Sequence, residues 1–287
     1  MSRSYAILEN RSVIHLGGPE AREFLQGLIT NDVDKLAPAG AIYGALLTPQ
    51  GKYLHDFFVF HLDDGLALDC ETERKDDLVR RLTLYRLRAK VTIEDVSEAY
   101  AIAALWDAES APTLGQAPAV FADPRLAALG WRAVLDRETA ATVLDQAGWT
   151  AAGAADYDRW RLALGVTDGS RDLLVEKSFL LEGNFEELNG VDFEKGCYVG
   201  QENTTRQKHR GVVRKRFLRV DIAGPAPEPG TPIMLGDKQA GTMRSSADGA
   251  GIALLRLEFV DKAAEAGESL VSGDARLTPI KPDWATF

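Results

Sequence analysis

One cysteine with a glycine on either side is the strongest chemical signal in this chain. Cys197 lies in the segment 195–202, which reads KGCYVGQE. Glycine adopts backbone angles that bulkier residues avoid, so Gly196 and Gly200 predict a tight turn that presents the thiol outward. The neighbouring Lys195 favours the thiolate, the form that acts as a nucleophile and as a soft metal ligand. The alternative is a glycine-rich bend that holds a small buried cysteine.

Two polar side chains follow the cysteine in the same segment. Gln201 and Glu202 supply an amide and a carboxylate about one helical turn from the sulfur. With the thiol they make the segment a candidate reactive site. Other catalytic patterns are missing from the sequence, which has no dinucleotide fingerprint, no complete phosphate loop and no nucleophile elbow. The four histidines are scattered, and each fits a surface or core position better than a catalytic one.

The cysteine count limits the metal chemistry that the chain can do alone. Cys70 is the second cysteine, and the acidic residues on both sides of it disfavour its thiolate, so we expect it to be inert. With two cysteines and four histidines, we do not expect a self-contained zinc site or an all-protein iron–sulfur cluster. The same count excludes a disulfide framework and is typical of a reducing compartment.

Length and charge narrow the class of protein further. The chain has 287 residues, 45% of them hydrophobic, which predicts two or three domains with cores of their own. The net charge of −10 argues against nucleic-acid binding. No apolar run reaches the roughly 20 residues of a membrane span, and the first residues do not resemble a secretory signal. We expect a soluble intracellular protein that binds neither nucleic acid nor membrane.

The charge is unevenly distributed along the chain. The segment 195–219 contains eight basic residues and one acidic residue. Such a segment on an acidic protein indicates that an anionic ligand or partner docks there. The alternative is an exposed basic strand that pairs with acidic neighbours in the same fold. The sequence leaves both interpretations open.

Hydrophobic periodicity predicts the elements that position these residues. An apolar stripe after Pro19 predicts a helix that ends near Asn31, and three prolines predict a loop over 110–124. Further helices are predicted over 71–87, 137–148 and 156–164. Strands are predicted over 41–47, 54–62, 66–68, 89–93 and 131–135. Short alternating strands over 212–222, 232–235, 241–245 and 252–257 predict a small antiparallel barrel.

The segment KGCYVGQE resembles the signature of the YgfZ-type folate-binding proteins, which are relatives of the glycine-cleavage T-protein, a tetrahydrofolate-dependent aminomethyltransferase. The resemblance extends over most of the chain: 18–32 is similar to the family's first helix, 85–91 to its central helix-to-strand junction, and 210–216 to its entry into the C-terminal barrel. It implies an α+β fold of three domains in a T-protein-like ring, with two α+β units and a C-terminal antiparallel β-barrel around a central channel. The implied domains are 1–45 with 150–208, 46–149, and 209–287.

The resemblance also implies a role in maturation or repair of iron–sulfur proteins, particularly those with 4Fe-4S clusters. Cys197 would be the essential thiol and a ligand of a transiently shared cluster. The other implied motif residues are Lys195, Gln201 and Glu202, which shape its surroundings, and Gly196, Tyr198 and Gly200. The implied partners are an A-type cluster carrier and 4Fe-4S client proteins, in the bacterial cytoplasm or, in a eukaryote, in the mitochondrial matrix.

Tetrahydrofolate is the cofactor that the resemblance implies. T-proteins carry two acids in the strand after the glycine-containing hairpin, but here His55 replaces one and only Asp56 remains, which puts aminomethyl transfer in doubt. Glu182 resembles the glutamate that pairs with the pterin edge, with Asn184 beside it; the alternative for Glu182 is an exposed loop position. A carboxylate that accepts two N–H bonds suits a 2-amino-pyrimidinone. Arg206 and Lys208 are expected at the channel mouth.

Two other functions stay open. The first is a tetrahydrofolate-dependent one-carbon enzyme, an aminomethyl or methyl transferase or a demethylase, which would use Asp56 and Glu182. The second is a docking module without ligand chemistry, whose basic segment binds an acidic cluster carrier. An assembly factor is the expectation, rather than a classical enzyme.

Overall fold

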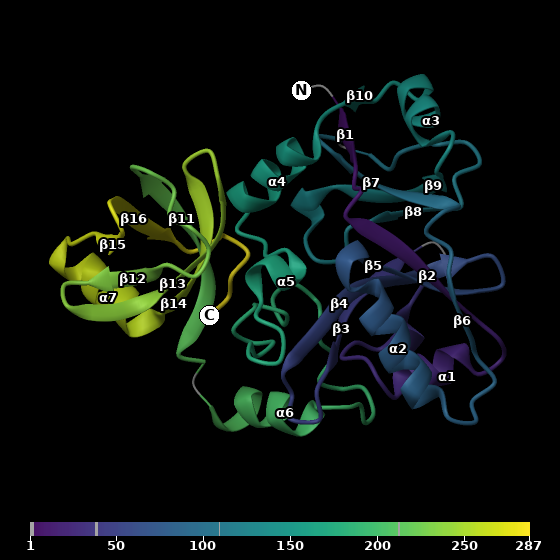
Figure 1. Ribbon diagram of the computed structural model, residues 1–287, viewed down its shortest axis with the longest axis horizontal. Coiled ribbons are helices and arrows are strands. Elements are labelled where there is room, and N and C mark those ends of the chain that lie inside the picture. The colour runs from purple at the N-terminus through teal and green to yellow at the C-terminus, as the bar shows by residue number, and fades with distance from the viewer. Residues whose placement is uncertain (1–2, 38–39, 109, 212) are drawn as a thin grey trace. The chain divides into compact units, whose positions relative to one another are not determined.

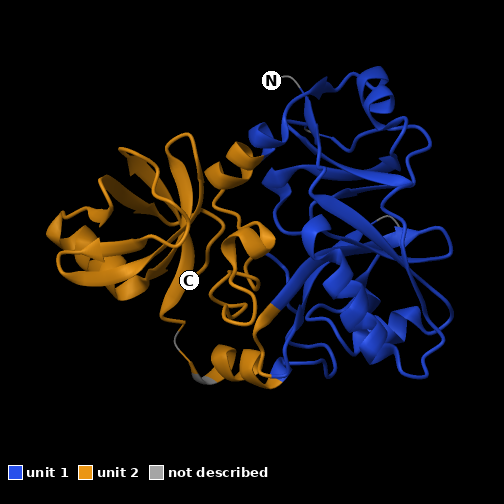
Figure 2. Cartoon of the chain, viewed as in Figure 1, with its two compact units in different colours: residues 1–49, 54–157, 188–201 blue, residues 50–53, 158–187, 202–287 orange. Residues whose placement is uncertain are grey.

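The computed structural model describes residues 3–37, 40–108, 110–211 and 213–287. The chain forms two compact units, which Figure 2 distinguishes by colour. Unit 1 comprises 1–49, 54–157 and 188–201, and unit 2 comprises 50–53, 158–187 and 202–287. Two five-stranded sheets belong to unit 1, and a closed six-stranded barrel belongs to unit 2 (Figure 1).

The first sheet of unit 1 has the strand order β10-β1-β7-β9-β8. These strands are β10 (Thr150–Ala151), β1 (Ser4–Ile7), β7 (Tyr100–Trp106), β9 (Trp131–Asp136) and β8 (Ala119–Ala122). Its apolar face packs against α3 (Ala140–Gln146), with Leu105, Leu135 and Leu144 in the core. The predicted strand at 131–135 and the predicted helix over 137–148 are therefore confirmed, the helix with shorter bounds.

The strand β8 lies inside the stretch that we predicted to be a loop, so that prediction is wrong for residues 119–122. Pro118 and Pro124 flank this strand and do not interrupt it. As an edge strand it also needs a ladder partner on one side only, which β9 supplies.

The second sheet has the order β3-β4-β5-β2-β6. Its strands are β3 (Ala41–Leu47), β4 (Tyr53–Leu62), β5 (Gly65–Glu71), β2 (Arg11–Gly17) and β6 (Thr92–Asp95). The predicted hairpin is confirmed, and β3 has the predicted bounds. The predicted helix over 71–87 forms as the short 3-10 turn η2 (Thr72–Arg74) followed by α2 (Lys75–Arg86).

The first helix ends earlier than its apolar stripe predicts. α1 spans Ala21–Gln26, and the short 3-10 turn η1 (Val33–Lys35) follows. Ile29 belongs to the predicted stripe and is buried, but it forms an isolated β-bridge with Leu46. The Thr30 N–H also donates to the Ala45 carbonyl, at 3.0 Å. Pairing with β3 therefore replaces the last predicted helical turn.

Buried charges connect strands of the two sheets. The guanidinium groups of Arg11 on β2 and Arg132 on β9 each bind one oxygen of Asp69 on β5, at 2.6 Å. Arg132 also lies 3.4 Å from Asp123, which Arg125 binds at 2.7 Å. All five side chains are buried. Burying charge is unfavourable unless it is paired, so these ion pairs specify how the sheets pack within unit 1.

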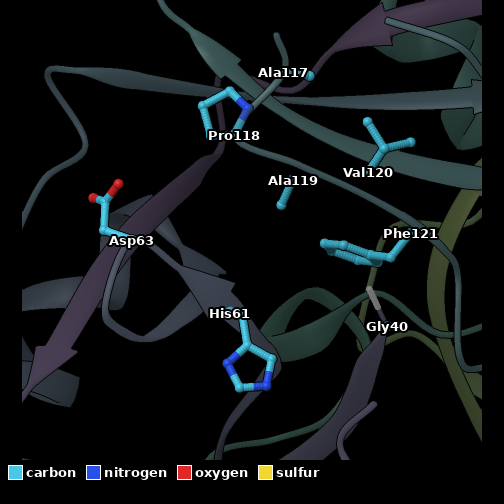
Figure 3. A pocket seen from close by; sticks show the side chains of 8 residues that line it. All are labelled: Gly40, His61, Asp63, Ala117, Pro118, Ala119, Val120 and Phe121. Atoms are coloured by element: carbon cyan, nitrogen blue, oxygen red, sulfur yellow. The ribbon is translucent and has the colours of Figure 1, made fainter. Parts of the chain in front are cut away.

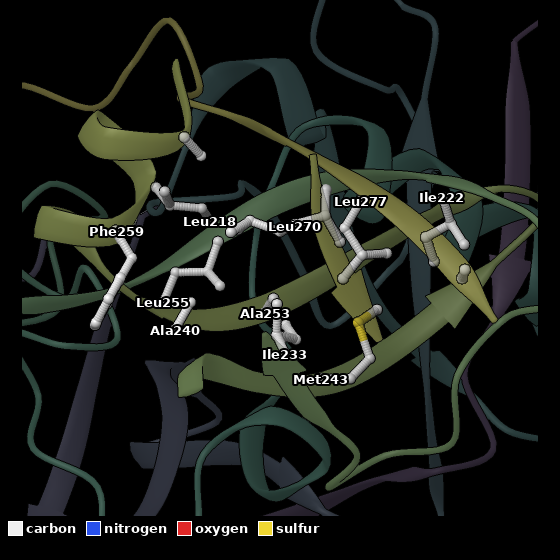
Figure 4. Packing of buried hydrophobic residues seen from close by; sticks show 13 residues of the cluster. Leu218, Ile222, Ile233, Ala240, Met243, Ala253, Leu255, Phe259, Leu270 and Leu277 are labelled. Carbon is white, nitrogen blue, oxygen red and sulfur yellow. The ribbon is translucent and has the colours of Figure 1, made fainter. Parts of the chain in front are cut away.

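The barrel of unit 2 closes in the order β11-β14-β13-β12-β15-β16, with β16 paired to β11. Its strands are β11 (Lys215–Ala223), β12 (Pro232–Leu235), β13 (Lys238–Ala247), β14 (Ala250–Arg256), β15 (Leu270–Ser272) and β16 (Ala275–Ile280). Met243, Leu255 and Leu277 lie in its core (Figure 4). The predicted barrel is confirmed. Leu257, predicted to end a strand, instead begins α7 (Leu257–Ala266), whose Phe259 joins the same core.

The described ranges also contain α4 (Ala154–Ala163), α5 (Gly169–Asp172), α6 (Gln201–Arg210) and the short 3-10 turn η3 (Ala127–Leu129). α4 confirms the helix predicted over 156–164. No helix in the described ranges is long and apolar enough to span a bilayer. The two compact units do not coincide with the three implied domains, whose boundaries stay a prediction.

Candidate functional site

Cys197 lies in a loop over 191–200 that contains neither helix nor strand, and its side chain is exposed. The predicted outward presentation of the thiol is thus confirmed, and the buried alternative is wrong. Only one of the two flanking glycines has a backbone that requires glycine: Gly200 has φ +85°, whereas Gly196 is not among the positive-φ residues. A Cβ at Gly196 would meet nothing within 4 Å.

A turn at 198–201 follows the cysteine. The Gln201 N–H donates to the Tyr198 carbonyl at 3.3 Å, and the Tyr198 N–H donates to Gln201 Oε1 at 3.2 Å. This reciprocal pair, with Gly200 in the left-handed region, is typical of a turn that requires glycine at its third position. Gln201 therefore holds the backbone beside the cysteine, a contact that the sequence did not reveal.

The loop that carries Cys197 is fastened to the segment that follows α1. The Asp192 N–H donates to the Thr30 carbonyl at 3.0 Å, and Thr30 Oγ1 donates to the Gly190 carbonyl at 2.7 Å. Asn31 Nδ2 donates to the Asn189 carbonyl at 2.7 Å, and Lys35 forms an ion pair with Asp192. These contacts lie within unit 1, so the cysteine extends from an anchored base.

Lys195 provides the most concentrated anchor. Its Nζ donates to the carbonyl oxygens of Gln26 (2.8 Å), Ile29 (2.6 Å) and Asn31 (2.8 Å). Gln26 is the last residue of α1, and the last carbonyls of a helix have no partner within it, so the ammonium group caps this helix end and also binds the segment that follows. Burial lowers the pKa of Lys195 to about 8, so the group is still mainly protonated at neutral pH.

An ammonium group has three protons, and these carbonyls use all of them. Lys195 has no N–H left to donate to the Cys197 sulfur. The structure shows it as the residue that positions the loop, and its predicted effect on the thiol stays a prediction.

Part of the basic segment 195–219 is paired within the fold. Lys208 binds Glu186, Arg216 binds Glu187 at 2.9 Å, and Arg219 binds Asp221 at 2.8 Å. The side chains of Glu202 and Arg206 are exposed on α6, Arg214 is exposed just before β11, and Lys215 is exposed at the first position of β11. Self-pairing, one of the two interpretations that the sequence left open, thus accounts for part of this segment, and an equally large exposed set stays available to a partner.

Asp56 and His55 are successive buried residues of β4, so their side chains point to opposite faces of the strand. The Tyr43 hydroxyl donates to Asp56 Oδ2 at 2.8 Å. On the other face, His55 Nε2 lies 2.9 Å from Asp77 Oδ2. Burial and the charge of Arg74 lower the pKa of His55 to about 4, so it is neutral near pH 7. His55 therefore adds no charge beside Asp56.

Glu182 and Asn184 belong to unit 2. Glu182 is half-buried, and its Oε2 accepts the Phe179 N–H at 3.1 Å. Asn184 is fully buried with φ +58°, and its Nδ2 donates to the Phe217 carbonyl at 2.7 Å while its Oδ1 accepts from Arg216 at 3.2 Å. Both polar atoms of the Asn184 side chain thus bind β11. Its implied cofactor contact stays a prediction.

A pocket of about 360 Å³ lies in unit 1, between the β4–β5 turn and the edge strand β8. Figure 3 shows His61 and Asp63 on one side and Pro118 to Phe121 on the other. None of the predicted site residues lines this pocket. In the described part of the chain, no three His, Cys, Asp or Glu side chains come together as a metal site.

Comparison with known proteins first defines the class. Residues 8–150 match the family model described as the GCVT N-terminal domain, and residues 214–287 match the CAF17 C-terminal beta-barrel domain. The crystal structure of glycine cleavage system aminomethyltransferase T from Bartonella henselae has a TM-score of 0.77 over 99% of this chain and 86% of that one, at 14% identity. The chain has the T-protein-like fold that the signature implied.

Sequence relatives then define the family. The mitochondrial iron-sulfur cluster assembly factor IBA57 of Homo sapiens is 33% identical over 96% of this chain and 84% of its own length. The Mus musculus protein is 32% identical over the same shares, and the Mycosarcoma maydis homolog is 31% identical over 97% and 83%. The chain belongs to this family of iron–sulfur cluster assembly factors, and the resemblance to the YgfZ-type proteins is confirmed.

Proposed function

We propose that this protein acts in the maturation or repair of iron–sulfur proteins and that Cys197 is its reactive thiol. The observation that carries this proposal is an exposed cysteine on a loop whose base is fastened by several hydrogen bonds to the segment that follows α1. A fastened loop presents the sulfur in one orientation, which is what a ligand shared between two proteins requires.

A single thiol cannot hold a cluster alone, because iron–sulfur clusters in proteins take four ligands, mostly cysteine thiolates. Cys70 cannot assist, since it is 2% exposed and burial raises the pKa of its thiol to about 12. The partner must therefore contribute the other ligands. A cluster carrier of the A type and its 4Fe-4S client proteins fit this requirement, in the bacterial cytoplasm or the mitochondrial matrix.

The test replaces Cys197 by Ser in a strain that lacks its own copy of the protein. We expect the activity of 4Fe-4S enzymes to stay at the level of the deletion strain. Cys70→Ala is the matched control and should restore activity, because that thiol is buried. Normal 4Fe-4S enzyme activity with Cys197→Ser would overturn the proposal.

Tetrahydrofolate is the cofactor we propose. Glu182 fits an acceptor for the pterin edge, because the one hydrogen bond to its carboxylate among the described residues uses Oε2 and leaves Oε1 for a ligand N–H. Asp56 fits as a fixed carboxylate, since Tyr43 holds its Oδ2. When bound, the cofactor would carry a one-carbon unit. Loss of tetrahydrofolate binding in Glu182→Gln, measured by calorimetry, would support this assignment, and unchanged binding would contradict it.

A tetrahydrofolate-dependent one-carbon transferase is the second candidate, and the buried Asp56 carboxylate is the observation that favours it. Steady turnover of a methylamine-type substrate that is lost in Asp56→Asn would place this function above the first. The absence of turnover with the wild-type protein would exclude it.

A further inference from the structure

A β-bulge in the barrel of unit 2 brings two polar residues together on β13. Met243 pairs with Ala253 and Ser246 with Gly251, so the two residues between the pairs on β13 face a single residue on β14. Those two residues are Arg244 and Ser245. Bulges of this kind re-aim side chains and are common beside binding sites.

Ser245 belongs to a buried hydrogen-bond network around Asp172, the last residue of α5. Asp172 Oδ1 accepts from the Ser245 N–H (3.0 Å) and Oγ (2.6 Å). Asp172 Oδ2 accepts from Arg161 Nη1 (3.0 Å) and from the Asp168 N–H (2.8 Å). An ionised carboxylate offers about four lone pairs to donors. Asp172 therefore has no acceptor position left.

Two polar groups beside this network remain unused. Arg244 is 7% exposed, and its buried Nε has no hydrogen-bond partner among the residues that the structure describes. Thr167, which follows the Arg161-bound carbonyl of Val166, is 2% exposed, and its hydroxyl also has no partner there. A buried charge without a partner costs several kcal/mol, and an unsatisfied buried group indicates a missing water or ion. Because the Arg244 Nε–H can only donate, the group that is missing there is an acceptor.

Charge selects the kind of acceptor. Arg161 is bound by the carboxylates of Asp158 at 2.7 Å and Asp172 at 3.0 Å, whereas among the described residues no carboxylate binds Arg244, so the positive charge of Arg244 has no bound counterion. A monoanion neutralises it, whereas a dianion would add repulsion from Asp172. A carboxylate also matches the two parallel N–H groups of a guanidinium. We propose that unit 2 binds the carboxylate group of a small molecule at Arg244.

The experiment uses the full chain labelled with ¹⁵N-arginine and follows the guanidinium N–H signals by NMR. The Arg244 signal is assigned by its loss in Arg244→Gln, or in Arg244→Lys if the glutamine variant does not fold. Sodium acetate is added against sodium chloride at equal ionic strength. We expect a saturating shift of the Arg244 signal with acetate and a weaker response to phosphate at the same concentration.

Two variants serve as controls. Arg214→Gln removes an exposed guanidinium and should leave the acetate response unchanged. Cys197→Ser should also leave it unchanged, so that failure of the thiol proposal and failure of this one are distinguishable. A response that does not saturate, that equals the chloride response, or that is stronger for phosphate overturns the proposal.

Discussion

Replacing Lys195 by Met tests whether this residue positions the Cys197 loop. The change removes three hydrogen bonds to the carbonyls of Gln26, Ile29 and Asn31 and keeps the length of the side chain. Charged hydrogen bonds contribute more than neutral ones, but Lys195 is half-buried, so we use the neutral range of about 0.5–1.5 kcal/mol each. The loop should then lose about 2–4 kcal/mol of anchoring free energy.

Hydrogen exchange of the loop amides measures this loss. The Asp192 N–H is the most direct probe, because it donates to the Thr30 carbonyl at 3.0 Å within the anchored base. A loss of about 2–4 kcal/mol corresponds to exchange that is faster by roughly 30-fold to 1,000-fold. Amides of the barrel in unit 2 should keep their wild-type rates.

Lys35→Met is the matched control, because Lys35 pairs with the same loop at Asp192 but is exposed. Exposed ion pairs contribute little to stability, so exchange of the loop amides should rise much less than in Lys195→Met. Alkylation of Cys197 by iodoacetamide gives a second measurement, since a loosened loop changes how the thiol is presented. Wild-type exchange rates in Lys195→Met would refute the assignment of Lys195 as the anchor.

Three further changes have outcomes that the structure sets. The pKa of His55 is lowered to about 4 from its ordinary 6.5, so between these pH values the unfolded chain binds more protons than the folded one. The free energy of unfolding should therefore fall by about 3 kcal/mol through this residue as the pH falls from 6.5 to 4. The variant His55→Asn should flatten the pH dependence of urea unfolding. Gly200→Ala should destabilise the chain by about 1–2 kcal/mol because its φ is +85°, whereas Gly196→Ala should stay within about 0.5 kcal/mol; equal urea midpoints for the two would contradict the turn. Asp69→Asn leaves Arg11 and Arg132 without their shared buried carboxylate and should cost about 3–5 kcal/mol in urea unfolding, and a loss below about 1 kcal/mol would mean that the cluster does not specify the packing.

The apolar patterns of the sequence predicted helices and strands best where the apolar residues are also the ones that the fold buries. β3 and β12 have the predicted bounds, and the apolar run of β3 is buried at every position from 42 to 47. α6 was missed because it carries no apolar stripe: all ten of its residues are polar. A helix of this composition gives no hydrophobic period to detect.

The sequence by itself determined the family signature, the T-protein-like fold class and the cysteine to examine. Only the tertiary structure decided what the residues around it do. Lys195 meets carbonyls that lie 164 to 169 positions away in the chain, and every residue type has a carbonyl, so no sequence pattern encodes that contact. Among the described residues Arg244 binds no carboxylate for the same kind of reason: the acceptor positions of Asp172 are filled by groups that only folding brings together. The residue types determine which functional groups the chain has, and the folded backbone determines which of these groups are already used in hydrogen bonds within the protein.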